Sequence, residues 1–309
     1  MNLKEIEYIV KIAEEGNVSH AAEKLFITPS ALNQQLLHLE KDIGAQLFQR
    51  IRNGWLPTEA GEIYLEGARE ILRTKKETYQ RLHDIIESHK GSLTISFPPE
   101  RGSFMFTNVY PRFHARYPDV VINVKETSVR NQQELIKKGE VDVGFVTLRE
   151  NQQTGDTYLP IYREDLILAL PSEHPLCQKS KIKGNKKYGE LSLSALQNET
   201  FAFMSKESTI YDCIRQLFRD AGFVTSILFE TARASTILEM VSAGLCCSIV
   251  PDSDSLKHIP GVSFFYLDTH PSWNMMASYQ KGSYLSKPAK YFIQLATEYW
   301  KSCKEGLTI

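Results

Sequence analysis

The sequence predicts an α/β protein with three parts: a small helical amino-terminal domain, one long helix, and a larger two-lobed domain. Apolar residues recur every three or four positions through residues 3–40 and again through 59–88, which is typical of amphipathic helices. From residue 93 onward, short strand-like runs alternate with helical segments, which favours a parallel sheet with right-handed crossovers. Because 309 residues exceed the usual size of a single core, two or three compact units are expected.

The boundaries between these parts follow changes in the residue pattern. We assign residues 1–58 to the amino-terminal domain, 59–89 to the long helix and 90–309 to the larger domain. Predicted chain crossings near Tyr162 and near Leu267 divide the larger domain into lobe I (90–162 and 268–309) and lobe II (163–267). Two lobes joined by two crossings predict a hinge with a cleft.

The composition is ordinary for a soluble protein, with 42% hydrophobic residues, 24% charged residues and a net charge of −1. No apolar run approaches the length of a membrane span. The first residues, MNLKEIEYIV, interleave charges with apolar residues, unlike a secretory signal. We therefore expect a cytoplasmic protein that has no membrane partner.

Five cysteines stand at positions 177, 213, 246, 247 and 303, an odd number without CxxC spacing. This pattern argues against a disulfide framework and against a structural zinc site, so we predict reduced thiols and no bound metal. Cys246 and Cys247 lie in the apolar run GLCCSIVP. Core packing is the stronger interpretation of that pair, and a redox switch is the weaker one.

The first predicted helix runs from Leu3 to about Ala13 and has one apolar face. It ends at Gly16-Asn17, where left-handed backbone is easily adopted. We expect this helix to pack across the two helices that follow it.

The stretch from Ser19 to Glu40 predicts two short helices separated by a tight break. Thr28 can accept a backbone hydrogen bond as an N-cap, and Pro29 suits the first helical position because its missing N–H has no partner there. Three leucines at helical spacing face inward: Leu32, Leu36 and Leu39. Four residues then face outward: Ser30, Asn33, Gln34 and Leu37. A mostly polar face without carboxylates suits the major groove of DNA.

A β-hairpin is predicted next, because Asn53-Gly54 is a turn signal between two strand-like pairs. Arg50 and Arg52 of this hairpin, a wing, would offer guanidinium groups to phosphates. A solvated turn is an equally good interpretation of the segment taken alone. Residues 1–88 contain 11 Lys and Arg against 14 Asp and Glu, so any basic surface is local.

The long helix is predicted from Glu59 to about Ser88, a stretch without proline that Thr58 can cap. Apolar residues from Ala60 to Ile86 predict a single seam along roughly 45 Å, at about 1.5 Å per residue. A matching helix from a second subunit is the favoured partner. Packing on its own domain is the alternative.

The larger domain is predicted to contain short strands and helices in alternation. For lobe I we predict a linker at 89–92, strands at 93–97, 120–125 and 141–147, and helices at 104–117 and 132–138. For lobe II we predict strands at 164–171, 199–204, 224–230, 248–251 and 262–267, and helices at 209–221 and 235–243. A closing helix is predicted at 287–304. Ligands bind beyond the carboxyl ends of parallel strands, which points to 98–103, Thr127-Ser128 and Thr147.

These residues resemble LysR-type transcriptional regulators along essentially the whole chain. The amino-terminal motif of that family is present as Ser19, Ala21-Ala22, Leu25, Thr28-Pro29-Ser30, Leu39-Glu40, Gly44, Leu47-Phe48, Arg50 and Thr58-Glu59-Ala60-Gly61. The second half matches more loosely, through Phe113 with Tyr117-Pro118, 141–144, His174-Pro175-Leu176, and Gly244 with Val250-Pro251. Asn33 and Gln34 depart from the Ser and Arg of many members, and Pro57 replaces the usual Leu.

The resemblance implies a winged helix-turn-helix, a dimerising linker helix, and a two-lobed effector domain like a periplasmic binding protein. It also implies homodimers that pair into homotetramers on double-stranded promoter DNA, contact with RNA polymerase, and control by a small-molecule effector. We expect the effector to be a small organic acid or a similar metabolite, and we expect no cofactor.

Within this family frame, Ser30, Asn33 and Gln34 are assigned to base edges, and Thr28, Arg50 and Arg52 to phosphates. Pro29 and His38 complete the predicted DNA-binding set. Asn and Gln side chains can bond adenine through two hydrogen bonds. The alternative for the helix residues, a solvated face, is the weaker interpretation.

The family's effector cleft maps onto ten residues of this sequence: Pro98, Pro99, Glu100, Arg101, Ser103, Thr127, Ser128, Thr147, Met204 and Ser205. Hydroxyls and backbone amides in such places often hold a carboxylate. Pro98 and Pro99 lack N–H donors, and Glu100 would oppose an anion unless it points away. Arg101 could compensate for that charge.

Three other classes of function are less favoured. An enzyme lacks support because GxSxG, P-loop, HExxH and paired cysteine ligands are all absent. A solute-binding module without DNA function is opposed by residues 1–60 and by the lack of a signal sequence. A redox-controlled or ligand-independent regulator of the same fold stays open.

Overall fold

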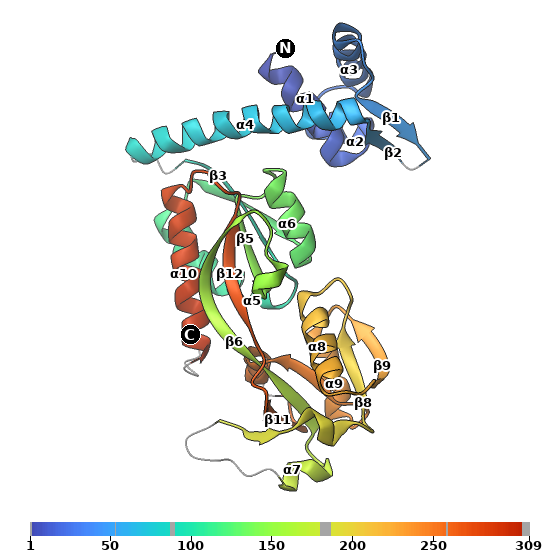
Figure 1. Ribbon diagram of the computed structural model, residues 1–309. Helices are drawn as coiled ribbons and strands as arrows, with labels where there is room; N and C mark the ends of the chain where they lie inside the picture. Colours follow the sequence, from blue (N-terminus) through green and yellow to red (C-terminus); the bar gives the residue numbers. More distant parts are fainter. Residues whose placement is uncertain (1, 53, 87–89, 180–186, 258, 305–309) are drawn as a thin grey trace. The chain divides into compact units, whose positions relative to one another are not determined.

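The computed structural model describes residues 2–304 apart from 53, 87–89, 180–186 and 258 (Figure 1). Contacts divide the chain into two compact units, residues 1–87 and 88–309, and each unit is described by itself. Among the described residues, no helix is both long enough and apolar enough to cross a membrane.

The first unit contains three short helices, a hairpin and a long helix. In order these are α1 (Leu3–Glu15), α2 (Val18–Lys24), α3 (Pro29–Ile43), β1 (Phe48–Ile51), β2 (Gly54–Pro57) and α4 (Glu59–Ile85). Gly16 ends α1 in the left-handed conformation, with φ of 58°. The Thr28 hydroxyl accepts the Ala31 N–H at 3.2 Å, and Pro29 occupies the first turn of α3. The predicted break and caps are thus present, whereas Asn53 of the predicted turn lies outside the described residues.

Glu40 and Thr58 connect the helices to the hairpin through side-chain hydrogen bonds. Glu40 Oε1 accepts the N–H groups of Leu47 at 2.6 Å and Phe48 at 3.2 Å. The Thr58 hydroxyl donates to the Gln46 carbonyl at 2.6 Å and accepts the Gly61 N–H at 3.0 Å. Both motif residues therefore satisfy backbone groups at element ends that would otherwise lack partners.

The long helix α4 carries its apolar residues along one broad side, and their burial changes along the length of the helix. Leu65 and Ala68 are buried in the core of the first unit, and Leu65 was not part of the predicted seam. Ile63 is 70% exposed and Ile85 is 76% exposed. The difference follows position along the helix: Leu65 and Ala68 lie in the part of α4 that packs in the core of the first unit, whereas Ile86 lies about five turns beyond Ala68 on the same side and is exposed.

Gly61 lies where α4 meets the connection before β1, and Gly61→Ala is expected to destabilise the first unit. A Cβ at Gly61 would lie 1.9 Å from the Leu47 carbonyl oxygen. Because the clash is with backbone, we expect a loss of about 1–3 kcal/mol, measured as a lower urea midpoint by circular dichroism. Gly67, in the same helix, has no atom within 4 Å of an added Cβ. Gly67→Ala should therefore stabilise by about 0.5–1 kcal/mol, and equal effects from both substitutions would contradict the packing argument.

The second unit is built on a mixed sheet in the order β4-β3-β5-β12-β6-β11-β7, with β10 pairing β6 and a separate parallel pair β8-β9. Its strands are β3 (Gly91–Phe97), β4 (Val120–Glu126), β5 (Val143–Leu148), β6 (Thr157–Pro171), β7 (Gly189–Leu191), β8 (Thr200–Met204), β9 (Ser226–Thr231), β10 (Ser248–Pro251), β11 (Val262–Leu267) and β12 (Ser272–Tyr279). Strands β3, β4 and β5 are parallel, as predicted, but β12 runs antiparallel to both β5 and β6. The parallel sheet that the sequence favours is therefore present for β3, β4 and β5 but does not extend to β12.

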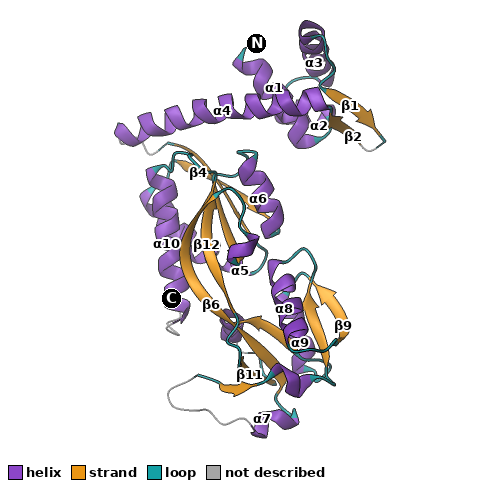
Figure 2. Ribbon diagram, viewed as in Figure 1, coloured by secondary structure: helices purple, strands orange, loops and turns teal. Residues whose placement is uncertain are grey.

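Helices cover both sides of this sheet (Figure 2). They are α5 (Arg101–Arg116), α6 (Val129–Lys137), α7 (Pro175–Lys179), α8 (Thr209–Asp220), α9 (Ala234–Ser242) and α10 (Lys287–Lys304), with short 3₁₀ turns at 150–152, 193–196 and 252–257. Alternate residues of β5 face opposite sides: Val143 and Phe145 pack with α5 and α10, whereas Val146 and Leu148 pack with Val129 of α6.

Strand β6 connects the two lobes. Its first part, Thr157 to Asp165, pairs with β12, and its second part pairs with β10 and β11. The long strand therefore continues through both lobes (Figure 1). This pairing holds the lobes together at the point where the chain crosses between them.

Several predicted boundaries in the second unit differ from the structure, and one long strand was missed. The predicted linker residues Gly91 and Ser92 belong to β3, while His89 lies outside the described residues. Arg101 to Ser103 form the first turn of α5 instead of a loop, and β6 begins at Thr157 instead of Glu164. Strand β12 was not predicted. Its sequence, SWNMMASY, mixes strand formers with Met, Ala and Asn, and pairing on both edges decides its conformation.

Candidate functional site

The outward face of α3 carries most of the residues predicted to contact DNA. Ser30, Gln34 and His38 are exposed, and Asn33 is half-buried. Leu32 and Leu36 on the opposite face are fully buried. His38 Nδ1 lies 3.3 Å from Asp42 Oδ2, so a carboxylate stands beside this face. The helix presents amide and hydroxyl groups to solvent over its first two turns.

The β1–β2 hairpin places the two predicted arginines at its tip. Arg50 pairs with Trp55 in the hairpin register, and Arg52 follows β1; both side chains are exposed. The Trp55 N–H donates to the Gly16 carbonyl at 2.8 Å, which fixes the hairpin against the end of α1. Exposed guanidinium groups on an anchored hairpin are suited to phosphate contact.

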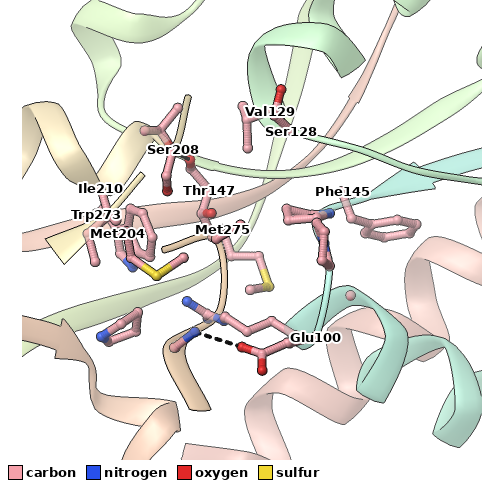
Figure 3. Close-up of a pocket in the computed structure, with 18 of the residues that line it drawn as sticks. Glu100, Ser128, Val129, Phe145, Thr147, Met204, Ser208, Ile210, Trp273 and Met275 are labelled. Atoms are coloured by element: carbon pink, nitrogen blue, oxygen red, sulfur yellow. Dashed lines mark hydrogen bonds between the residues drawn. The ribbon is translucent and has the colours of Figure 1, made fainter. Parts of the chain in front are cut away.

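A cavity of about 300 Å³ lies between the two lobes of the second unit (Figure 3). Eight of the ten residues predicted for the effector cleft line it: Pro98, Pro99, Glu100, Arg101, Ser128, Thr147, Met204 and Ser205. Ser103 and Thr127 do not. The cavity-facing positions at the start of α5 are instead Arg101, Gly102 and Met105, and the Thr127 hydroxyl bonds the Asn131 amide at 2.8 Å within its own turn.

Glu100 joins the two lobes across this cavity. Its backbone φ is 60°, an uncommon value for a residue with a Cβ. Glu100 Oε2 accepts the Ala234 N–H at 2.8 Å, and the Ser235 hydroxyl donates to Oε1. Because Ala234 is the first residue of α9, the carboxylate caps that helix and lies at the positive end of its dipole. The acid that was expected to oppose an anion therefore has partners in lobe II.

Arg101 forms a buried ion pair with Glu164 on β6. Arg101 Nη2 donates to Glu164 Oε2 at 2.7 Å, and the Glu164 side chain has 0% exposure. Glu164 also accepts the Ser253 N–H at 2.9 Å and the Trp273 indole N–H at 3.0 Å. This carboxylate thus connects α5 to β12 and to the turn after β10. It satisfies the condition under which buried charges are tolerated, which is full pairing.

Three further hydroxyl-bearing residues line the cavity: Ser128, Thr147 near the end of β5, and Ser208 (Figure 3). Ser128 caps α6, and Ser208 precedes α8. The Thr209 hydroxyl donates to the Thr147 carbonyl at 2.6 Å, which is a second contact between the lobes. Backbone N–H groups at helix starts attract ligand oxygens.

Sequence reasoning missed the aromatic and sulfur-containing wall of the cavity. Trp273 and Met275 lie on β12, and Trp300 lies on α10. Trp273 and Met275 were missed because β12 was not predicted, and Trp300 was missed because the packing of the predicted closing helix beside the cavity could not be read from its sequence. Trp273 and Trp300 are two of only three tryptophans in the chain, and that scarcity was the available signal, since aromatic side chains are common in ligand pockets.

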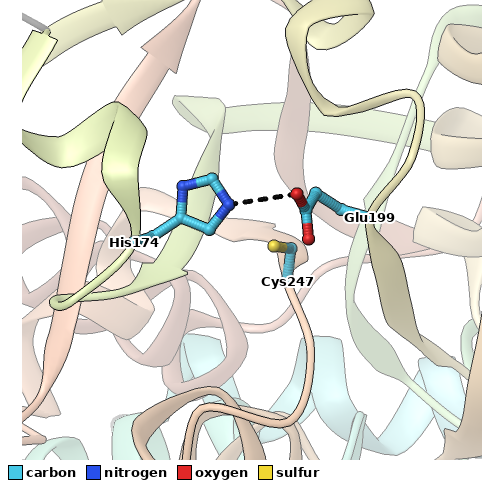
Figure 4. Close-up of side chains that lie close together, drawn as sticks. All are labelled: His174, Glu199 and Cys247. Carbon is cyan, nitrogen blue, oxygen red and sulfur yellow. Dashed lines mark ion pairs between the residues drawn. The ribbon is translucent and has the colours of Figure 1, made fainter.

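Three side chains with metal-binding chemistry meet in lobe II: His174, Glu199 and Cys247 (Figure 4). His174 Nε2 lies 3.3 Å from Glu199 Oε1, while His174 Nδ1 accepts the Leu176 N–H at 3.2 Å. An acceptor at Nδ1 places the ring proton on Nε2, where it points at the carboxylate. Burial raises the pKa of the Cys247 thiol to about 12. A raised thiol pKa disfavours the thiolate that would bind a metal ion.

The other thiols are also poorly suited to redox chemistry. Burial raises the pKa of Cys177, Cys213, Cys246 and Cys303 above the usual range for a thiol. The thiolate is the reactive form of cysteine, and these shifts reduce its population. A redox switch gains no support from them.

Family models match nearly the whole chain. Residues 3–62 match the bacterial regulatory helix-turn-helix protein, lysR family, and residues 87–301 match the LysR substrate binding domain. Among similar proteins, the HTH-type transcriptional regulator YcgK of Bacillus subtilis is 25% identical over 308 residues, which is 96% of this chain and 94% of that protein. HcaR, the hca operon transcriptional activator of Escherichia coli, is 27% identical over 96% of this chain and 98% of its own.

Solved structures show the same fold. A full-length OxyR variant from Pseudomonas aeruginosa matches with a TM-score of 0.71 at 20% identity, covering 96% of this chain and 97% of that one. Full-length CbnR in complex with its target DNA matches with a TM-score of 0.59 at 22% identity, covering 96% and 99%. The chain belongs to the LysR family of DNA-binding transcriptional regulators, with a helix-turn-helix at its amino terminus followed by an effector-binding domain.

Proposed function

We propose that the chain binds promoter DNA through α3 and the β1–β2 hairpin, and that a small molecule in the cavity between the lobes controls the outcome of that binding. The observation that carries this proposal is the cavity itself, whose walls come from both lobes. A ligand that touches both lobes changes the balance between their arrangements. The exposed α3 face supplies the matching DNA-binding surface.

On the DNA side, α3 reads bases and the hairpin contacts the backbone. Ser30, Asn33 and Gln34 reach base edges, with His38 one turn further along the exposed face. Thr28, Arg50 and Arg52 position the domain on phosphates, and Pro29 begins the helix beside them. This division follows from chemistry, because amide side chains match base edges and guanidinium groups match phosphate oxygens.

On the effector side, the lobe contacts explain how a ligand acts. Glu100 bonds the start of α9, and Thr209 bonds the Thr147 carbonyl. Arg130 and Asp212 form a further cross-lobe pair, with Nη2 and Oδ2 at 2.7 Å. A molecule that inserts beside Glu100 and Thr147 strengthens or replaces these contacts. Its binding free energy is thereby coupled to the relative position of the lobes.

We further propose that the chain forms homodimers through α4, that these dimers pair as homotetramers on DNA, and that the assembly contacts RNA polymerase. The support lies in the exposed apolar side of α4, formed by Ile63, Ile71, Tyr79, Leu82, Ile85 and Ile86. An apolar stripe of this length on a surface helix is typical of an interface.

Replacing Leu82 and Ile85 by Glu is expected to convert dimers into monomers, because the two introduced charges would be buried without partners. Leu82 is 50% exposed and Ile85 is 76% exposed, so the fold of the first unit should be preserved. Light scattering after gel filtration would measure the mass. Gln80→Glu, on the opposite side of the helix, is the control and should leave the mass unchanged. A monomeric native protein would contradict the proposal.

The proposed function is tested on the full-length protein with its selected operator. A thermal-shift screen against small metabolites identifies compounds that stabilise the chain, since a ligand that binds the native state raises the melting temperature. Each stabilising compound is then added to a footprinting experiment on the operator. We expect at least one to change the footprint. Stabilising compounds that never alter the footprint would contradict control by the cavity.

A further inference from the structure

We infer that Arg101 and Trp300, which line the cavity, recognise an uncharged oxygen acceptor on a mostly apolar ligand. The effector would then be an amide-like or ketone-like molecule instead of a free carboxylic acid. This inference rests on the proposed use of the cavity as the effector site. Three features of the cavity carry it: buried donors without partners, a fixed guanidinium group, and a negative balance of charge.

Among the residues that the structure describes, no hydrogen-bond partner is found for three buried N–H groups of side chains that line the cavity. They belong to Arg101 Nε, Arg101 Nη1 and Trp300 Nε1, and we call them the donor cluster. Both residues line the cavity, and the Arg101 guanidinium carbon lies 5.2 Å from the centre of the Trp300 ring. Buried donors without acceptors are costly. A ligand oxygen placed among them removes that cost.

The donor cluster is held in place by its surroundings. Arg101 uses Nη2 for Glu164, and its guanidinium also lies over Trp273, with the carbon 5.6 Å from the ring centre. Glu164 is fixed in turn by the Ser253 N–H and the Trp273 indole N–H. The guanidinium therefore cannot swing toward another acceptor without breaking a buried ion pair. Preorganised donors of this kind favour a ligand that fits them directly.

The charges around the cavity oppose an anionic ligand. Arg101 is the one basic residue among the described side chains that line it, whereas Glu100, Glu207 and Asp254 are acidic. Glu164 neutralises Arg101 from behind. Burial alone would lower the pKa of Arg101, but Glu164 and Asp254 outweigh it and raise the pKa overall, so the guanidinium stays charged. An incoming carboxylate would meet net negative charge, and a neutral oxygen would not.

The remaining wall selects an apolar skeleton. Met105, Phe145, Met204, Trp273 and Met275 contribute side chains to it, and methionine adapts its shape to the molecule that it contacts. A ligand that satisfies both parts has a ring or a short hydrocarbon chain joined to a carbonyl. A primary amide meets this description, and its carbonyl oxygen can accept more than one hydrogen bond.

Matched pairs of probes that differ only in the polar group test this inference. Phenylacetamide is compared with phenylacetate, and hexanamide with hexanoate, by calorimetric titration of the full-length protein at pH 7. We expect each amide to bind about tenfold or more tightly than its carboxylate, because the acidic side chains of the lining repel the carboxylate.

Two variants assign the preference to the donor cluster. Arg101→Lys keeps a cation opposite Glu164 but removes the Nε and Nη1 donors, and Trp300→Phe removes the indole N–H while keeping an aromatic ring. Each should weaken amide binding about fivefold or more. Tyr299→Phe, at the neighbouring position of α10 and outside the cavity lining, is the control and should leave amide binding unchanged.

Tighter binding of either carboxylate would overturn the inference, as would the absence of amide binding or amide binding that both variants leave unchanged. These failures are separable from failure of the proposed function. Carboxylates that bind tightly and change the operator footprint would refute the neutral-ligand inference and support control by the cavity. Amides that bind through the donor cluster without changing the footprint would support the neutral-ligand inference and refute control by the cavity.

Discussion

Glu164→Ala is expected to lower the free energy of unfolding of the second unit by about 3–5 kcal/mol, because it leaves the buried Arg101 charge without its partner. Glu164 has no exposed side-chain surface, and its oxygens accept three hydrogen bonds: from Arg101, from the Ser253 backbone and from the Trp273 indole. The loss of this one carboxylate therefore removes a hydrogen-bond acceptor from α5, from the turn after β10 and from β12. Urea denaturation followed by tryptophan fluorescence measures the loss, since Trp273 reports on this region.

A double substitution separates the cost of an unpaired charge from the value of the pair. Arg101→Met alone should also cost about 3–5 kcal/mol, because it leaves a buried carboxylate facing only two neutral donors. Combining Arg101→Met with Glu164→Met removes both charges at similar volume. The double variant should lose far less than the sum of the single losses, since residues in contact couple strongly. Additive losses would contradict the argument.

The sequence was most informative where structure is set by neighbouring residues. The Thr28 cap, the proline after it and the Gly16 and Gly44 helix ends act within a few residues, so pattern reasoning located α1 to α4 closely. Leu65 shows where that approach stops. Its burial depends on how α4 packs against the rest of the first unit, and helical spacing alone does not show how far along an apolar seam that packing extends.

The cavity was only partly predictable for a related physical reason. The residues after β3 and β5 follow from the rule that sites lie at the carboxyl ends of parallel strands, and that rule placed Glu100, Arg101 and Thr147 on the wall. Trp273 and Met275 come from an antiparallel strand whose conformation depends on pairing with β5 and β6. No local signal encodes such pairing. The donors that bond Glu164 and Glu100 could likewise not be predicted, because they are more than 60 residues away in the sequence.

Gln34→Ala is expected to relax sequence recognition and to weaken operator binding by about 1–3 kcal/mol, the usual value of one direct base contact. Gln34 is exposed on the face of α3 opposite the buried Leu32 and Leu36, so its removal should not affect folding. Titration of the variant against the operator and against random DNA separates the two kinds of binding. Gln35→Ala, an exposed neighbour of the same chemistry, serves as the matched control and should bind the operator almost normally.

Arg52→Ala should weaken DNA binding without changing sequence recognition. Comparing it with Gln34→Ala separates a phosphate contact from a base contact better than either variant does alone. A phosphate contact carries no sequence information, so this substitution should weaken binding to operator and random DNA alike and reduce the salt dependence by roughly one counterion. If Gln34→Ala instead weakened both DNAs equally, the assignment of Gln34 to a base edge would be refuted. Loss of specificity in Arg52→Ala would place the hairpin in a groove, because only base or groove-shape contacts discriminate between sequences.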